Sequence, residues 1–364
     1  MKPRPCGCKG CRTCLICEIE YGAENLKTSQ NLDKNKGYVY CPFCDKAWKG
    51  WDIESYKEHP NHSGDPIYIP GVYIKVDFIS EEEETKFMKH IDEMPWDISQ
   101  SGRRKQNFGP KTNFKKKKIV CGSFEGFPEF SQFLQERFES VDLLRGYEVI
   151  EQCSLEYDPS KGASIDPHID DCWIWGERVV TVNCIADSVL TMTPYNGGIT
   201  KYNLQCADEY APVVTPDRTV DFNIKGSSVL EASKPLVEKD VIIRIPLIRR
   251  SLTILYGEAR YHWEHCVLRE DIPARRVCIA YREFTLPYMD KAAKETKHSD
   301  NEKSHSHEDA QDRGAEVLAV HDVVDKETEA MELGVHGHPH DYHYTGDNLQ
   351  IDKRILDCTK MKTD

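Results

Sequence analysis

Alternating hydrophobic and polar residues predict short β-strands over the second half of the chain. From Tyr147 onward the alternation has a period of two, in which successive side chains point to opposite faces of a sheet. The predicted strands are 148–157, 163–170, 178–185, 241–245, 251–256, 263–268 and 275–284, with an earlier strand at 67–78. Short strands at this spacing are typical of a β-sandwich or barrel.

Two segments that precede most of these strands have helical periodicity. Ser80 and Glu83 form a capping-box pattern ahead of a predicted helix over 81–94, where apolar residues recur at helical spacing. A second helix is predicted over 128–141, with Pro128 in its first turn. The expected fold is therefore mainly β with flanking helices (α+β).

Three segments differ in composition from this predicted domain, which covers 66–286. Residues 1–50 are rich in cysteine, and 191–238 form a Gly/Pro/Asp-rich stretch that we interpret as an insertion between strands. Residues 287–364 are polar and charged, and we predict a disordered tail because such a composition cannot compensate the entropy lost on ordering. Loose metal binding by the histidines of this tail is the alternative.

Charge and cysteine content narrow the class of protein. The 364 residues carry a net charge of −13, which argues against a general nucleic-acid coat. The chain has 15 cysteines and no apolar leader at Met1, so we expect a reducing compartment, namely the cytoplasm and nucleus. The most apolar stretch, 241–248, is short and contains Arg244, so no membrane association is expected.

The cysteine-rich segment has the spacing of metal ligands. Thiolates with two residues between them (C-x2-C) on a tight turn suit two corners of a tetrahedral zinc site, and a separate C-x2-C pair follows at a zinc-ribbon separation. We predict a structural zinc, with an iron–sulfur cluster and free thiols as the alternatives. The candidate ligands are Cys6, Cys8, Cys11, Cys14, Cys17, Cys41 and Cys44, which exceed the needs of one site.

Segment 101–118 is the most basic part of the chain. It includes Arg103, Arg104, Lys105 and Phe108 and contains no acidic residue. It is either a solvated hairpin whose charges aid solubility or a flexible flap that binds an anionic partner. Both interpretations stay open.

Candidate iron ligands occur in the motif D-P-H-I-D at 166–170. His168 and Asp170 are two residues apart on a predicted strand, so both side chains leave the same face and can bind one ion. The three letters H-I-D also occur at 90–92, but there they lie in the predicted helix, where residues two apart point in different directions. His262 or His265 would supply the third ligand. The two histidines face opposite sides of a strand, and spacing alone leaves both open.

Arg276 and Arg282 share one face of the predicted strand 275–284, whereas Val277, Ile279 and Tyr281 share the other. Guanidinium groups match planar carboxylates, so this pair of arginines could bind a small dicarboxylate. Two solvated arginines on an amphipathic strand are the alternative.

The motifs D-P-H-I-D, W-E-H and R-R-V-C-I-A-Y-R-E, in this order, resemble the AlkB family of Fe(II)- and 2-oxoglutarate-dependent dioxygenases. That family has an H-x-D pair, a distal His and an R-x5-R pair. The stretches C-K-G-C-R-T-C-L-I-C-E and S-G-R-R-K-Q-N-F-G-P-K-T-N-F are similar to the branch of the fourth animal homologue. The resemblance implies a double-stranded β-helix (jelly-roll) core with an N-terminal cysteine-rich module.

The resemblance also implies roles for individual residues. His168, Asp170 and His265 would bind Fe(II), with O2 and 2-oxoglutarate as co-substrates. The side chains implied to contact 2-oxoglutarate are Tyr157, Arg276 and Arg282. Many relatives have Asn where this chain has Leu155, so that polar contact would be lost or come from a neighbour such as Ser154.

The implied reaction is oxidative N-demethylation, which releases formaldehyde, succinate and CO2. Bacterial-type members have an acid two positions after the metal Asp to contact the damaged base, whereas this chain has Cys172, followed by Trp173. This difference favours a methylated protein lysine, with actin as the implied substrate, because aromatic faces can hold a methylammonium. Demethylation of N6-methyladenine in DNA is the alternative, in which segment 101–118 would bind phosphates. A non-catalytic, zinc-stabilised adaptor is the alternative of a different class.

Overall fold

The structure is a computed structural model. It describes residues 4–10, 12–24, 32–114, 117–120, 126–209, 214–215, 217–222 and 240–285. The predicted tail, 287–364, lies outside the described residues, as does Cys11. The chain divides into two compact units, of which the first comprises Met1–Gly109 and Phe127–Tyr288. The described part of the second unit contains the hairpin of β6 (Lys111–Asn113) and β7 (Lys118–Val120).

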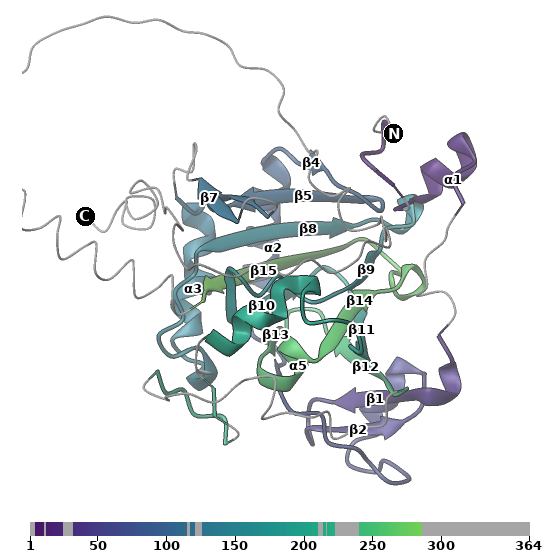
Figure 1. Cartoon of the computed structure of the whole chain (residues 1–364), viewed down its shortest axis with the longest axis vertical. Helices are drawn as coiled ribbons and strands as arrows, with labels where there is room; N and C mark the ends of the chain where they lie inside the picture. The colour runs from purple at the N-terminus through teal and green to yellow at the C-terminus, as the bar shows by residue number, and fades with distance from the viewer. Residues whose placement is uncertain are drawn as a thin grey trace, which may run out of the picture. The chain divides into compact units, whose positions relative to one another are not determined.

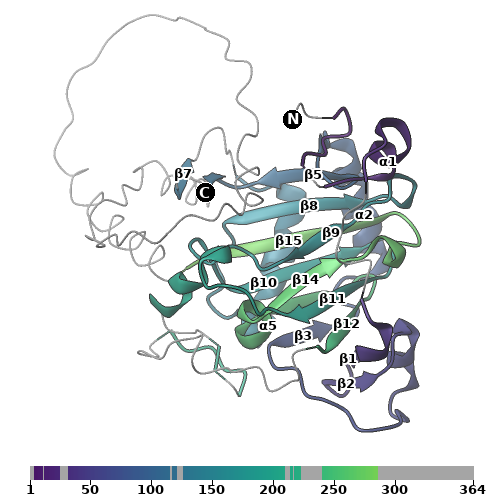
Figure 2. The ribbon, with the colours of Figure 1, turned by 45° about the vertical axis from the view of Figure 1, so that its right-hand side comes forward.

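Two β-sheets form the first unit (Figures 1 and 2). In strand order, the larger sheet contains β3 (Val72–Lys75), β13 (Leu252–Leu255), β10 (Trp175–Cys184), β15 (Arg276–Phe284), β8 (Glu151–Tyr157), β5 (Arg103–Phe108) and β4 (Asp97–Ile98). The smaller sheet contains β2 (Lys46–Lys49), β1 (Gly37–Cys41), β12 (Ile242–Leu247), β11 (Ser188–Pro194), β14 (Trp263–Val267) and β9 (Ile165–His168). Strand β1 pairs with β12 in parallel, and the other pairs of neighbours are antiparallel.

The core lies between the two sheets and continues on the outer face of the larger one. On β10, Val179 packs against Met192 and Ile243 of the smaller sheet, whereas the next residue, Val180, belongs to the outer cluster. Helices α2 (Glu81–Glu93) and α3 (Gln132–Phe138) cover that outer face with apolar side chains such as Phe87. Burial of each large apolar side chain contributes about 1.5–3 kcal/mol. This arrangement confirms the predicted mainly β, jelly-roll fold with flanking helices.

Helix α2 begins as its sequence predicts. The Glu83 backbone N–H donates to Ser80 Oγ (3.1 Å), and the Ser80 N–H donates to Glu83 Oε2 (2.8 Å), which completes the capping box. His90 lies on the exposed side of this helix beside Glu93, whereas Asp92 binds Arg275, so the two residues of the second H-x-D copy have separate partners. The other predicted helix, 128–141, is shorter than expected because a 3-10 turn at Glu129–Ser131 precedes α3.

The sequence prediction missed strand β11. The predicted insertion at 191–238 begins inside this strand, which pairs with β12 and β14 in the middle of the smaller sheet. Its partners are distant in sequence, and Pro194 and the following glycines interrupt its alternation. Strands β1 and β2 also differ from expectation. They come from the predicted 1–50 module, yet they extend the smaller sheet. The predicted strand 67–78 is reduced to β3.

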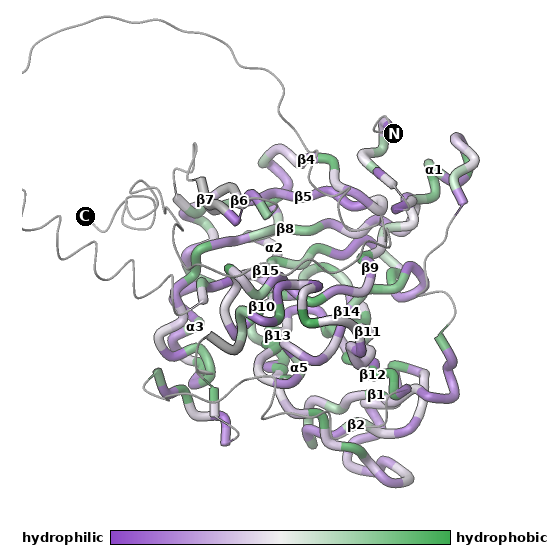
Figure 3. The backbone as a smooth tube through the Cα atoms, in the orientation of Figure 1, coloured by the Kyte–Doolittle hydropathy of each residue, from purple (hydrophilic) through white to green (hydrophobic). Residues whose placement is uncertain are grey.

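The basic segment 101–118 is not a single flap. Its first part is β5, which pairs with β8 along Arg103–Phe108 and is drawn mostly hydrophilic in Figure 3. A hydrophilic strand is stable here because its neighbour β8 supplies an acidic partner, Glu156, for Arg104. Two short helices complete the described fold, α1 (Leu15–Tyr21) and α5 (Gly257–Tyr261). Within the described residues, no helix has the length and apolarity needed to span a membrane.

Candidate active site

Three predicted iron ligands meet where β9 and β14 pair. His168 and His265 are register partners in this antiparallel pair, and their ring centroids are 4.3 Å apart. Asp170 follows β9, and the candidate ligand atoms of the three residues lie within 4.8 Å of one another. His262 is the C-cap of α5 and lies outside this group. Strand pairing therefore selects His265, which sequence spacing alone could not do.

The protonation states of the three residues suit a divalent cation. Burial lowers the pKa of His265 to about 3 and also lowers the pKa of His168. Burial alone would raise the pKa of Asp170, but Arg282 and the two histidines outweigh it and hold that pKa well below the ordinary value. Neutral imidazoles and an ionised carboxylate are the forms that bind metal.

Hydrogen bonds orient two of these ligands. His168 Nδ1 lies 2.9 Å from the carbonyl oxygen of Asp166, and a donated hydrogen bond there leaves Nε2 available to a metal. Asp170 Oδ1 accepts from Arg282 Nε (2.9 Å). Asp170 Oδ2 is buried without a hydrogen-bond partner among the described residues, 3.8 Å from His265 Nε2. A bound Fe(II) would satisfy this oxygen, so the donor set fits the ion.

Of the residues expected to contact 2-oxoglutarate, Tyr157 and Arg276 are buried, whereas Arg282 is partly buried and contacts Asp170. Arg276 on β15 is the register partner of Tyr157 on β8, and its guanidinium carbon lies 4.9 Å from the tyrosine ring centre. Within the described part of the chain, Arg276 Nη1 is buried and has no hydrogen-bond partner. Arg282 lies on the same face of β15 and binds Asp170 and Glu151. Arg276 thus offers a buried donor to a carboxylate, while Arg282 links the co-substrate end to the metal ligands.

Comparisons with known proteins agree with this geometry. No family model matches the chain. The human α-ketoglutarate-dependent dioxygenase alkB homolog 4 is 39% identical over 287 residues, which cover 78% of this chain and 88% of that protein, and the mouse protein is 39% identical over 288 residues. A Caenorhabditis elegans DNA N6-methyl adenine demethylase is 30% identical over 299 residues, also 78% of this chain and 88% of that protein.

The chain belongs to the AlkB homolog 4 family of Fe(II)- and 2-oxoglutarate-dependent dioxygenases. Its His-Asp-His group is that of an enzyme of this class. The alternative of a non-catalytic adaptor is therefore not supported.

The structure distinguishes the two alternatives for the polar contact that many relatives make with an Asn where this chain has Leu155. Either the contact is lost, or a neighbour such as Ser154 supplies it. Ser154 pairs with Gln106, whose side chain donates to the Ile91 carbonyl on the α2 side of the sheet. Because side chains alternate along β8, Leu155 and Tyr157 face the other sheet and Ser154 does not. Ser154 therefore cannot replace the missing amide.

Two buried polar residues that support the site escaped the sequence prediction. Asn183 Oδ1 accepts from Arg276 Nε (2.5 Å), and its Nδ2 donates to the carbonyls of Ala186 (2.9 Å) and Leu247 (2.8 Å). Arg260 donates to the Asp170 carbonyl (2.8 Å) and the Trp175 carbonyl (3.2 Å), which holds the loop after β9. A polar residue inside an apolar strand pattern, such as Asn183 in V-V-T-V-N-C, is the signal that could have indicated one of them.

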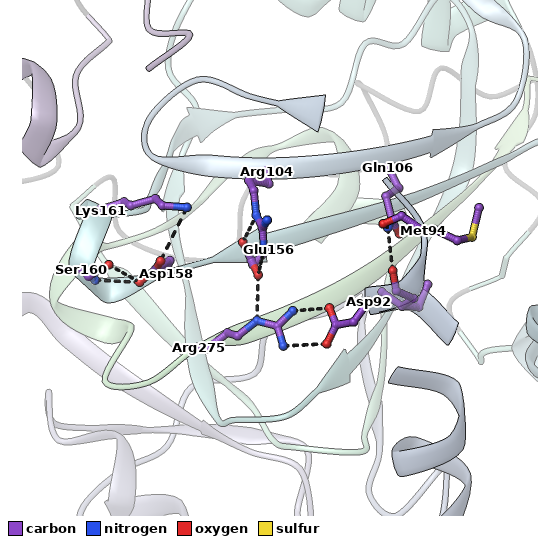
Figure 4. Close-up of polar contacts among 10 residues, drawn as sticks. Asp92, Met94, Arg104, Gln106, Glu156, Asp158, Ser160, Lys161 and Arg275 are labelled. Atoms are coloured by element: carbon purple, nitrogen blue, oxygen red, sulfur yellow. Dashed lines mark hydrogen bonds and ion pairs between the residues drawn. The ribbon is translucent and has the colours of Figure 1, made fainter. Parts of the chain in front are cut away.

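The predicted substrate contacts separate into three environments. Arg103 and Lys105 of β5 lie on the same face of the sheet as Tyr157 of β8, which is the face toward the site. The Tyr157 ring centre lies 5.9 Å from the Arg103 guanidinium carbon. Arg104 and Phe108 belong to the opposite face, and Arg104 binds Glu156 there (Figure 4). Cys172 is completely buried and packs with Ile169, Tyr202 and Leu204, and Trp173 is almost as inaccessible. Cys172 was therefore wrongly predicted as a substrate contact, because Arg260 and this cluster cover it.

The cysteines form two separate groups. Cys6, Cys8, Cys14 and Cys17 bring their Sγ atoms within 4.8 Å of one another, a donor set that zinc and iron–sulfur clusters share. The Ser101 backbone N–H donates to Cys8 Sγ (3.3 Å), which anchors this group beside the start of β5. Cys41 and Cys44 lie in a different group, with two histidines. The predicted zinc-ribbon combination of Cys41 and Cys44 with the N-terminal thiols is therefore wrong.

Proposed function

We propose that this AlkB-family enzyme removes a methyl group from a protein lysine, with actin as the first substrate to test. Fe(II), once bound, would supply the oxidation of the N-methyl carbon with O2 and 2-oxoglutarate, so that formaldehyde, succinate and CO2 are released. His168, Asp170 and His265 would hold the ion. Arg276 Nη1 would bind the far carboxylate of 2-oxoglutarate, and Arg282 holds Asp170 in its ionised form.

The burial of Cys172 carries the choice of substrate. This position follows the metal Asp by two residues, where bacterial-type members have an acid that contacts a base. Here its thiol is 0% exposed and lies 3.7 Å from Arg260 Nη1. Neither a carboxylate nor an accessible side chain is therefore present for a nucleobase at this position.

A balanced ion network on β5 supports the same choice. Arg104 Nη2 donates to Glu156 Oε1 (2.7 Å), and Glu156 Oε1 also accepts from Arg275 Nε (2.7 Å). Arg275 in turn binds Asp92 on α2 (Figure 4). Two guanidinium groups are thus matched by two carboxylates, so the charge of Arg104 is neutralised within the protein and is not available to a phosphate backbone.

Demethylation of N6-methyladenine in DNA is the second candidate. The 30% identity to a nematode DNA N6-methyl adenine demethylase favours it. The hairpin of β6 and β7 also contains lysines, Lys111 and Lys118, in the segment for which a flap that binds an anionic partner is one of the two interpretations. Its test is the same assay with a different substrate.

The experiment measures formaldehyde release by the Fe(II)-loaded, full-length protein with 2-oxoglutarate and O2. Methyl-lysine actin and N6-methyladenine DNA are supplied in parallel. His168→Ala should abolish release, and the matched control His90→Ala, which alters the exposed H-x-D copy on α2, should not. Release from actin alone supports the proposal, whereas release from DNA alone replaces it with the second candidate. Succinate formation without formaldehyde from either substrate would contradict both substrate assignments and leave the dioxygenase chemistry intact.

A further inference from the structure

A second group of metal-binding side chains lies at the far edge of the smaller sheet. Cys41 ends β1 and Cys44 lies in the turn to β2, whereas His59 and His62 follow a 3-10 helix at Ile53–Glu58. The candidate ligand atoms of all four residues are within 4.8 Å of one another. Figures 1 and 2 show the β1–β2 hairpin at the opposite end of the sheet from α1, which contains Cys17.

The two imidazoles of this group present buried nitrogens that lack partners. His59 Nδ1 and His62 Nε2 are both inaccessible to solvent, and neither has a hydrogen-bond partner among the described residues. Orphaned buried nitrogens are costly unless a ligand or ion satisfies them. Two thiolates and two neutral imidazoles form the donor set of a tetrahedral zinc site.

Two aromatic residues, Trp48 and Phe43, contact the donors. The Trp48 ring stacks on His62, with 4.8 Å between ring centroids, and Trp48 Nε1 donates to Cys44 Sγ (3.4 Å). Phe43, between the two cysteines, lies 5.6 Å from the His59 ring. Such contacts orient metal ligands. We propose that Cys41, Cys44, His59 and His62 bind a structural zinc ion.

The position of this site assigns it a role in the fold. Strand β1 pairs with β12, which is followed in the sheet by β11 and then by β14 with His265. The zinc ion would join the β1–β2 turn to the 3-10 helix, where Cys41 Sγ lies 3.7 Å from the Tyr56 carbonyl oxygen. It would thereby stabilise the outer edge of the sheet that holds an iron ligand. This proposal is independent of the substrate of the enzyme.

Zinc content of the full-length chain tests the proposal. The measurement uses a His168→Ala background, so that zinc at the iron site does not contribute. Cys44→Ala with His62→Ala should lose one zinc per chain, and His90→Ala, the matched control, should lose none. His62→Cys should retain the ion because cysteine is itself a zinc ligand. Unchanged zinc content in the double variant would overturn the proposal.

Cobalt substitution distinguishes loss of the site from loss of the fold. In a chain with Cys6→Ala and Cys17→Ala, which disable the four-cysteine group, Co(II) should give the absorption of a tetrahedral site with two sulfur ligands. His62→Cys should strengthen the sulfur-to-cobalt charge-transfer band. A cobalt spectrum without tetrahedral or sulfur-to-cobalt bands in the folded protein would refute the four-ligand site, whatever the stability of the double variant.

Discussion

Asn183 positions the arginine that we expect to bind 2-oxoglutarate, and Asn183→Leu tests this arrangement. The change keeps the branching at Cγ but removes the acceptor for Arg276 Nε and the two hydrogen bonds to the Ala186 and Leu247 carbonyls. A hydrogen bond to a charged group contributes about 1.5–3 kcal/mol, and a neutral one about 1 kcal/mol. We expect the free energy of unfolding to fall by roughly 3–5 kcal/mol. If about 1.4 kcal/mol of this loss reflects a misplaced guanidinium, the Kd for 2-oxoglutarate rises about tenfold.

The Kd for 2-oxoglutarate is measured by calorimetric titration of the Fe(II)-loaded protein under anaerobic conditions. The free energy of unfolding is measured with urea on the same preparation. Ser188→Ala is the matched control. It removes another buried hydrogen bond, from Ser188 Oγ to the Asp271 carbonyl (2.9 Å), outside the predicted co-substrate contacts. This control should lose about 1 kcal/mol of stability and keep its affinity for 2-oxoglutarate. A folded Asn183→Leu protein with unchanged affinity would refute the positioning role of Asn183.

Three further predictions concern ion pairs. Arg178 Nε donates to Glu283 Oε1 (2.9 Å) in a fully buried pair. Arg178→Leu should lower the free energy of unfolding, measured with urea, by about 3–5 kcal/mol because it leaves the Glu283 carboxylate buried and unpaired. The double variant with Glu283→Leu should recover much of this stability. The hydrogen bond from Arg137 lowers the pKa of Glu83 to about 2 from 4.5, so the stability from this pair is present above pH 4.5 and is lost as the pH falls toward 2. In Glu83→Gln the loss of folding stability between pH 4.5 and 2 should be smaller by about 1 kcal/mol, a modest value because the pair is partly exposed. An unchanged dependence of stability on pH in this range would contradict the assignment. Arg104→Gln should lower the melting temperature and leave DNA affinity unchanged in an anisotropy titration. Weaker DNA binding would instead assign Arg104 to phosphate contact.

Local patterns in the sequence predicted much of this protein correctly. Period-two alternation located β8, β10 and β15, because alternate residues of each strand face the other sheet and the helix-covered side. The S-x-x-E pattern located the start of α2, since a capping box involves residues three apart. The spacing of Arg276 and Arg282 placed both on one face of β15 for the same geometric reason. Each of these features depends on neighbours along the chain.

Only the tertiary structure decided which distant residues meet. The choice of His265 over His262 follows from the pairing of β14 with β9, and the partnership of Cys41 and Cys44 with His59 and His62 follows from the path of the chain after β2. Residue spacing determines the face of an element on which a side chain lies, whereas strand register and chain path determine what that face meets. By itself the sequence therefore determined the local elements and the composition of the iron site. Residue spacing left the third iron ligand open between His262 and His265; the family resemblance implied His265, and the pairing of β14 with β9 places it beside His168. The second metal site required contacts between segments far apart in the chain.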